Sequence, residues 1–270
     1  MSRINLVVND KNRKKVISEV SKNEKNVFLE GMPGVGNIGK QAIDYIAKDK
    51  NALNIAEIFS SYFPHIVTIK KGIKLPHHNL YYFKENDIGF FLYTGNVQSK
   101  EDEGTYEFAK FILDLISDFE VDEIITIGGI GLKSFIEDPT IYLLGDKKLT
   151  KKYKTEDTSL KAESKINVIL GLSGILLGHV DLLRKSKKDI DYKYMSVLIE
   201  TFNSPLYPSY KESKNIIKFF DEKFNLDIDY SKLDKKIESF DKNDVLSKNL
   251  KQLDNVKKAD QKDSWSSYIG

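Results

Sequence analysis

The sequence predicts an α/β fold in which helices flank a mostly parallel β-sheet, followed by a C-terminal helical extension. Two observations predict it. Short apolar runs of strand length alternate with longer segments whose apolar residues recur at helical spacing. Glycine clusters follow several of the strand-like runs, as expected for turns between strands and helices. Strands that alternate with helices form a mostly parallel sheet with the helices packed on it.

The expected elements follow from these apolar patterns. Strands are expected at residues 4–8, 26–30, 55–60, 66–69, 80–83, 88–94, 123–127, 140–144, 167–170 and 194–200. Helices are expected at residues 38–46, 105–119, 171–183 and 216–224, with a second C-terminal helical segment over 233–253. The charged stretch 147–165 is expected to be mobile. The domain organisation predicted is a polar lead-in (1–25), an α/β core domain (26–208), C-terminal helices (209–256) and a flexible tail (257–270).

Composition excludes several classes of function. The 270 residues carry 42 basic and 40 acidic side chains, a net charge of +2. Nucleic-acid and membrane-surface binders usually show a clear basic excess, which this chain lacks. Only three basic residues are arginines, and lysine is the poorer bidentate reader of phosphates. No partner of nucleic acid or membrane is therefore expected.

The cysteine count is zero, which removes disulfides, thiolate metal sites and a cysteine nucleophile together. The N-terminus lacks the apolar stretch of a signal peptide, and no apolar run is long enough to span a membrane. We expect a cytoplasmic protein.

The loop at residues 31–40 is the most chemically suggestive motif. Gly34, Gly36 and Gly39 match a dinucleotide fingerprint, and Gly34 through Lys40 match the spacing of a phosphate-binding P-loop. Gln41 stands where a P-loop needs serine or threonine to hold magnesium, and no apolar strand ends in the required aspartate. Close packing of a helix on the sheet explains the same glycines, and we favour it over cofactor binding.

Three further glycine clusters lie at strand ends or helix starts, in residues 93–98, 128–131 and 171–174. If their strands are parallel, the clusters gather along one rim of the sheet, where α/β proteins bind ligands. Gly128 and Gly129 therefore join Gly34, Gly36, Gly39 and Lys40 as a candidate ligand loop.

The sequence contains no recognisable catalytic set. Ser173 lies in a Gly-Leu-Ser-Gly-Ile context that departs from a nucleophile elbow, which needs glycine at the place of Ile175. The four histidines are not spaced as metal ligands. Glu200 ends an apolar strand without an identifiable partner. We expect no catalytic residues, no metal and no cofactor.

The C-terminus combines polar residues with three apolar side chains. Trp265 is the only tryptophan, and Tyr268, Ile269 and the terminal Gly270 follow it. An aromatic anchor near a free carboxylate is typical of a docking tail, which a partner captures in a pocket. The alternative is a tail that folds back on its own domain.

The order of these motifs resembles the proteasome assembly chaperone family of the second type, and most closely its archaeal branch. The resemblance covers residues 26 to 225 and rests on five segments. These are 28–39, 93–98, 128–131, 171–178 and the run 198–208 with Pro205 and Pro208.

The resemblance implies an α/β fold akin to nucleoside phosphorylases, homo-oligomers, and binding to the α-subunits of the proteasome core particle. Chaperones of this family often end in a hydrophobic residue, tyrosine and any residue. Here Tyr268 lies one place too early and follows Ser267. The leading interpretation is a non-enzymatic assembly chaperone or adaptor. The alternative is an enzyme that binds a small anionic ligand, such as a nucleotide, at the glycine-rich rim, in an ATP-grasp-like or nucleoside-processing reaction.

Overall fold

The computed structural model describes residues 3–69, 72–160, 166–186 and 192–240. Their strands form one sheet in the order β1-β3-β4-β5-β2-β6-β9-β7-β8. The strands are β1 (Ile4–Val8), β2 (Lys25–Gly31), β3 (Leu53–Ser60), β4 (His78–Glu85), β5 (Ile88–Gly95), β6 (Glu123–Leu132), β7 (Ile141–Gly145), β8 (Thr158–Ser159) and β9 (Lys193–Phe202). The helices are α1 (Asp10–Val20), α2 (Ile38–Asp49), α3 (Asp102–Ile116), α4 (Lys147–Tyr153), α5 (Gly171–Ser186), α6 (Tyr210–Phe224) and α7 (Ser231–Glu238), with short 3₁₀ turns η1 (Val35–Asn37) and η2 (Ser117–Phe119).

The α/β fold with helices flanking the sheet is confirmed. Strands β5, β2, β6 and β9 run parallel at the centre of the sheet. Antiparallel pairs extend it on both sides, where β4 pairs with β5 and β7 with β9, so the whole sheet is mixed. Helix α3 connects the central strands β5 and β6, whereas α2 leads from β2 to β3 in the antiparallel part of the sheet. The predicted hairpin of β4 and β5 turns at Asn86 and Asp87, both at positive φ.

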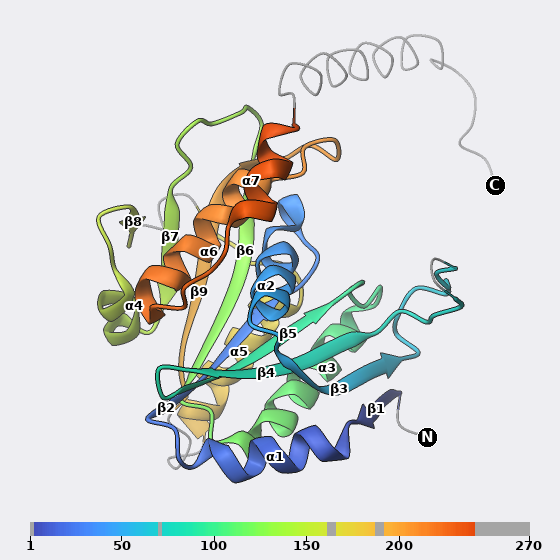
Figure 1. Ribbon diagram of the computed structural model, residues 1–270. Helices are drawn as coiled ribbons and strands as arrows, with labels where there is room; N and C mark the ends of the chain where they lie inside the picture. Colours follow the sequence, from blue (N-terminus) through green and yellow to red (C-terminus); the bar gives the residue numbers. More distant parts are fainter. Residues whose placement is uncertain (1–2, 70–71, 161–165, 187–191, 241–270) are drawn as a thin grey trace, which may run out of the picture.

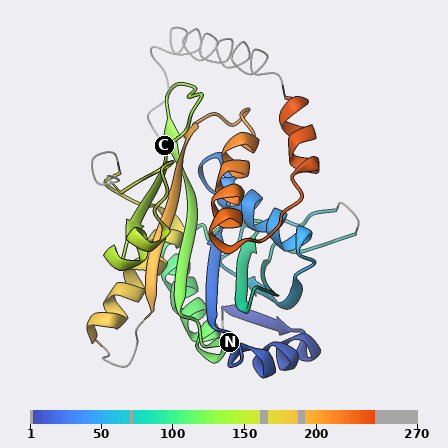
Figure 2. The same ribbon diagram turned by 60° about the vertical axis from the view of Figure 1, so that its left-hand side comes forward.

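Helices cover both faces of the sheet (Figure 1), and a layer of apolar side chains joins them to each face. One layer joins the sheet to α2, α4, α6 and α7, and the other joins it to α1, α3 and α5. Figure 2 shows the same arrangement from another side, with α6 and α7 on one side of β6 and β9 and α5 on the other. Because helices cover both faces of the central strands, the sequences of these strands are continuous apolar runs.

Three expectations for local structure were wrong. Residues 66–69 do not form a strand, since only Thr68 pairs, with Lys74. Residues 167–170 are also not a strand, and they lead into α5. The stretch expected to be mobile contains α4 and β8.

The N-terminal residues contribute more than the expected strand. Helix α1 follows β1, and Asn9 caps it by accepting a hydrogen bond from the backbone N–H of Asn12. The side chains of Val16 and Val20 anchor the helix in the core beside α3. At the other end of the chain, α6 confirms the first C-terminal helix. Helix α7 covers the start of the second, and residues 241–253 lie outside the described part.

Candidate functional site

The carboxyl ends of the parallel strands form the predicted glycine-rich rim. Because β5, β2 and β6 run in the same direction, the loops after them meet at one edge of the sheet. The loop after β2 leads to α2 on one face, and the loop after β5 leads to α3 on the other face. Such a reversal between adjacent strands is where open α/β sheets leave a crevice for ligands.

A cavity of about 410 Å³ lies at this rim. It is lined by the loop after β2, the end of β6, Gln98 from the loop after β5, and the segment that leads into α5. Its volume falls within the range typical of small-molecule sites. Gly34, Gly39, Gly128 and Gly129, all candidates from the sequence, lie in its wall.

Several of these glycines permit close packing. A Cβ atom on Gly39, in the first turn of α2, would overlap the backbone of Ile127. A Cβ atom on Gly129 would lie 2.5 Å from the carbonyl oxygen of Val35. The geometry of these two glycines fits the packing interpretation, since α2 and η1 can approach β6 only where the side chain is absent.

Gly36 and Lys40 do not line the cavity. Gly36 has φ +63° and packs against Ser209, and its carbonyl accepts a hydrogen bond from the Gln41 side chain at 3.2 Å. Gln41 also donates to the carbonyl of Pro208, at 2.8 Å. The Lys40 ammonium pairs with Asp44 on the next turn of α2. The loop is therefore held by the chain itself, and its one lysine is already paired.

Gln98 joins three segments of the rim. Its side-chain amide donates to the carbonyl of Pro33 in the loop after β2. Its side-chain oxygen accepts from the backbone N–H of Leu172 at 3.2 Å, in the first turn of α5. Gly171, at φ +75°, leaves room for Gln98, because a Cβ there would lie 2.7 Å from the Gln98 oxygen.

A buried acid lies directly behind the cavity wall. Glu30, in β2, is completely buried and accepts a hydrogen bond from the Ser173 hydroxyl at 2.8 Å. Its other carboxyl oxygen has no hydrogen-bond partner among the described residues. Burial raises the pKa of Glu30 to about 8, and the Ser173 hydrogen bond opposes this increase. Burial therefore favours the neutral carboxyl group at neutral pH, and its Oε2 is the oxygen that accepts from Ser173.

A second buried polar chain supports the same rim. The Tyr93 hydroxyl donates to Nδ1 of His78 at 2.6 Å, and Nε2 of His78 donates to the carbonyl of Val97 at 2.8 Å. Burial lowers the pKa of His78 to about 3, so the ring is neutral and can accept from Tyr93. The pair fixes Val97, the neighbour of Gln98.

Sequence reasoning missed Glu30 and Gln98. The available signals were an acid that directly follows the apolar run 27–29 and a glutamine in a glycine-containing loop. Ser173, considered as a nucleophile, instead donates a hydrogen bond to Glu30. Both ring nitrogens of His78 are hydrogen-bonded, one to Tyr93 and one to Val97. Glu200 is buried and accepts from the Tyr142 hydroxyl and the backbone N–H of Thr140, both at 3.1 Å.

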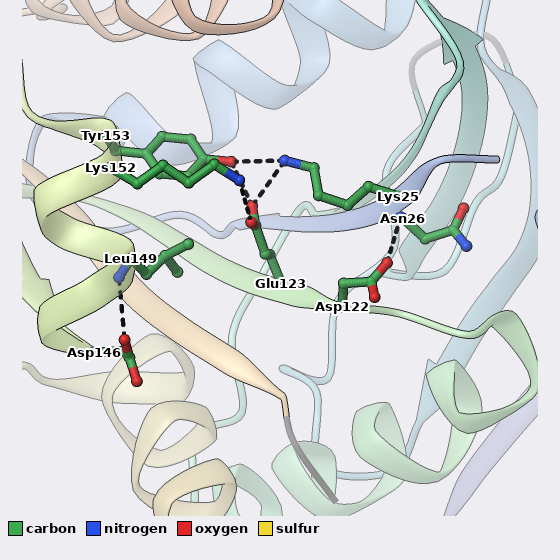
Figure 3. A network of polar contacts seen from close by, with 8 residues as sticks. All are labelled: Lys25, Asn26, Asp122, Glu123, Asp146, Leu149, Lys152 and Tyr153. Carbon is green, nitrogen blue, oxygen red and sulfur yellow. Dashed lines mark hydrogen bonds and ion pairs between the residues drawn. The ribbon is translucent and has the colours of Figure 1, made fainter.

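The opposite end of the central strands holds a second polar network (Figure 3). Glu123, at the start of β6, is 2% exposed and pairs with Lys25 at 3.2 Å and Lys152 at 3.1 Å. The Tyr153 hydroxyl donates to the same carboxylate. Burial opposes ionisation, but the Tyr153 hydrogen bond and the two ammonium groups outweigh it and lower the pKa of Glu123. Each charge has a partner, so this network ties β2, β6 and α4 together.

The predictions about a metal site and a membrane span can be compared with the structure over the described residues, and the predicted docking tail cannot. Within the described ranges no group of three or more histidine and acidic side chains is placed to hold a metal ion. No helix in the same ranges is long and apolar enough to cross a membrane. The predicted docking residues Trp265, Tyr268, Ile269 and Gly270 lie outside the described residues.

The sequence and the fold are similar to those of known proteins. The model of the PAC2 family matches residues 28–243, which is most of the chain. The structure of Pyrococcus furiosus PbaB, described as an archaeal proteasome activator, is 25% identical with a TM-score of 0.75, over 94% of this chain and 100% of that chain. Pyrococcus furiosus PbaA, described as an archaeal homolog of proteasome-assembly chaperone, is 22% identical with a TM-score of 0.62, over 87% of this chain and 92% of that chain. An uncharacterized protein of Methanocaldococcus jannaschii is 24% identical over 168 residues, which are 62% of this chain and 64%, less than two thirds, of that relative.

Proposed function

This chain belongs to the PAC2 family, and from that premise we propose that it acts as a proteasome assembly chaperone or adaptor. The observation that carries the proposal is the likeness to PbaB, because it extends over the whole of that chain at a TM-score of 0.75. PbaB is described as a proteasome activator and PbaA as a homolog of an assembly chaperone. The expected partner is the α-ring of a proteasome core particle, and the expected location is the cytoplasm.

The proposed contact is the C-terminal tail. Trp265, Tyr268 and Ile269 are the apolar side chains of an otherwise polar segment, and large aromatic anchors commonly dominate the energy of protein interfaces. If the chain forms an oligomer, several tails act together, and avidity raises the overall affinity without any new contact.

Self-association is proposed from an apolar loop between β3 and β4. This loop projects beyond the ends of both strands (Figure 1) and carries five exposed apolar side chains: Ile66, Val67, Ile69, Ile73 and Leu75. Ile69 and Ile73 are 81% and 82% exposed. Several large apolar side chains that one loop leaves in water favour an interaction site, and a second copy of this chain is the proposed occupant.

Native mass spectrometry with archaeal proteasome α-subunits tests the partner and the contact together. The samples are the full chain, a chain that stops at Ser264, the variant Trp265→Ala and the control Ser266→Ala. We expect binding by the full chain and the control only. Equal binding by all four would keep the partner but refute the tail as the contact. No binding by any would refute the proposed function.

Light scattering after size-exclusion chromatography tests self-association. Replacing Ile69 and Ile73 with aspartate should reduce the measured mass to that of one chain, because a charge within an apolar interface is costly to bury. The control is Leu182→Asp, an exposed leucine on α5. An unchanged oligomer in the double variant would exclude this loop as the interface.

A further inference from the structure

The cavity at the rim has the features of a binding site that the proposed function does not use. Its lining includes apolar residues from three segments, among them Met32, Ile169 and Leu198. Val168 and Leu170 also line it and are largely exposed, Leu170 by 83%. Apolar residues that stay in water beside a cavity favour a ligand that covers them.

The sheet itself leaves backbone groups at this cavity. The ladder between β2 and β6 stops at Thr126, whereas the ladder between β6 and β9 continues to Leu132. Beyond Thr126 the side of β6 away from β9 therefore has no partner among the described strands. Gly128, Gly129 and Gly131 of this stretch line the cavity. The carbonyl of Val35 already fills the space that a Cβ atom of Gly129 would take, so this stretch contributes backbone atoms to the cavity wall.

The charge of the site disfavours an anionic ligand. No lysine or arginine is among the described residues that line the cavity, and Lys40 nearby is paired with Asp44. The N-terminus of α5, where an anion could bind, already gives its Leu172 N–H to Gln98. The group behind this turn is an acid, Glu30, so a phosphate or carboxylate would be buried without a cation and beside a carboxyl group. This geometry does not favour the nucleotide expected as the alternative from the sequence.

One polar side chain of the lining, Ser173, offers a hydrogen-bond acceptor to a ligand. Ser173 lines the cavity, and its own proton is directed to Glu30. Its oxygen lone pairs therefore remain to accept from a ligand N–H or O–H. Glu30 is fully buried and keeps one carboxyl oxygen without a partner among the described residues. A buried, incompletely satisfied acid is unusual in a site with a purely structural role.

We propose that the rim cavity binds a small uncharged organic molecule, with an apolar body that contacts Met32 and Leu198 and an N–H or O–H group that donates to Ser173. The proposal is independent of proteasome binding. A chain that fails to bind α-subunits can still bind this ligand, and the reverse also holds.

Three isosteric probes separate the charge classes: benzamide is uncharged, benzoate is an anion and benzamidine is a cation. Each is titrated into the full chain while amide NMR shifts are recorded. We expect saturable shifts at Gly128, Gly129 and Gly171 with benzamide, and binding of benzoate at least about tenfold weaker, since its charge would be buried without a partner. Benzoate binding as tight as benzamide, or no saturable binding of benzamide, would overturn the proposal.

Two leucine variants locate the site. Gly34 lines the cavity and has an extended φ of −160°, and a Cβ atom placed on it would meet no other atom within 4 Å, so Gly34→Leu should fold and occlude the cavity. Gly178 on α5 has equally open space and lies outside this cavity, so Gly178→Leu is the matched control. Benzamide shifts should be lost in the first variant and kept in the second. Shifts that persist in Gly34→Leu would place the probe elsewhere and overturn the proposal.

A third variant remains informative if Gly34→Leu does not fold. Leu170→Glu changes a side chain that is 83% exposed, so it should not disturb packing. The added carboxylate at the mouth should make benzamidine the best of the three probes. An unchanged order of the three affinities would show that they bind away from this cavity and would overturn the proposal.

Discussion

Replacing Glu30 with glutamine should stabilise the protein at neutral pH. Glu30 is completely buried, its carboxyl group lacks a cationic partner among the described residues, and its pKa is raised from 4.5 to about 8. In the unfolded chain the acid ionises at about pH 4.5, whereas in the folded protein it holds its proton up to about pH 8. The free energy of unfolding therefore decreases as pH rises between these two values, because the folded state binds more protons there.

The size of the effect follows from the shift. Each pH unit inside the window changes the free energy of unfolding by about 1.4 kcal/mol. From pH 4.5 to pH 7 the wild type should lose about 3 kcal/mol of its free energy of unfolding through Glu30, and about 4 kcal/mol by pH 8. Glutamine does not titrate, so Glu30→Gln removes this loss. It also keeps an oxygen that can accept from Ser173. The amide nitrogen is buried without a partner, as the second carboxyl oxygen is, so these values are upper bounds.

Urea unfolding at pH 4.5, 6, 7 and 8 measures the effect. The stability of the variant minus that of the wild type should be smallest at pH 4.5 and rise steadily up to pH 8. All other titrating groups are common to both proteins and cancel in this difference. Glu107→Gln, at an exposed position on α3, is the control and should show no such rise. A difference that stays constant within about 0.5 kcal/mol over the whole range would refute the reasoning about the buried acid.

Three further predictions concern the rim and the network opposite. Gly36→Val should lower the free energy of unfolding by about 1–3 kcal/mol, because φ is +63° at this residue. Gly34→Val should change it by no more than about 0.5 kcal/mol, and urea unfolding of both variants and the wild type checks this. Glu123→Gln should destabilise by about 3–5 kcal/mol at pH 7 by leaving Lys25 without its partner. The loss should shrink as pH falls below 4.5, since the folded pKa of Glu123 is lowered; acid titration of both proteins checks this. Because burial lowers the pKa of His78 to about 3, the free energy of unfolding should decrease by about 3 kcal/mol as pH falls from 6.5 to 4. His78→Leu should remove that decrease in the same titration.

The parts of the fold that were predictable depend on local patterns. Strand β5 and helix α3 were predicted to within a few residues, because a covered strand is apolar throughout and a surface helix has one apolar stripe. The rim followed from the same patterns, since glycines after parallel strands must meet at one edge of the sheet. Helix α1 was missed because it buries only Val16 and Val20, too few to form a stripe.

The errors arose where an apolar run stays in water. Residues 66–69 and 167–170 have the composition of strands, but Ile69 and Leu170 are exposed. Composition predicts that a segment prefers burial and does not show whether the chain provides a partner. Strand β6 shows the opposite case. It was expected to end at Ile127, yet it continues to Leu132, because β9 supplies hydrogen bonds for the glycines.

The contrast between Gly34 and Gly36 was also beyond the sequence. Both belong to the fingerprint, and close packing was expected to explain both. Only Gly36 is closely packed, against Ser209 and at positive φ, while Gly34 is extended and faces open space beside the cavity. The spacing of glycines identifies a turn, but tertiary neighbours such as Ser209 decide which glycine the turn requires.

Two of the buried glutamates of the central strands, Glu30 and Glu123, have opposite electrostatic surroundings, and this difference separates the two networks. Glu123 receives two ammonium groups and a tyrosine hydroxyl, so its ionised form is compensated and its environment is complete without a ligand. Glu30 receives one serine hydroxyl and keeps an oxygen without a partner among the described residues. Burying an acid in this way costs stability, and a structural role alone would be served better by an apolar side chain of similar size. The cost is understandable if Glu30 fixes the direction of the Ser173 proton, because the lone pairs of that hydroxyl are then available in the cavity. The rim, and not the ionic network, is therefore where a ligand of this chain should be sought.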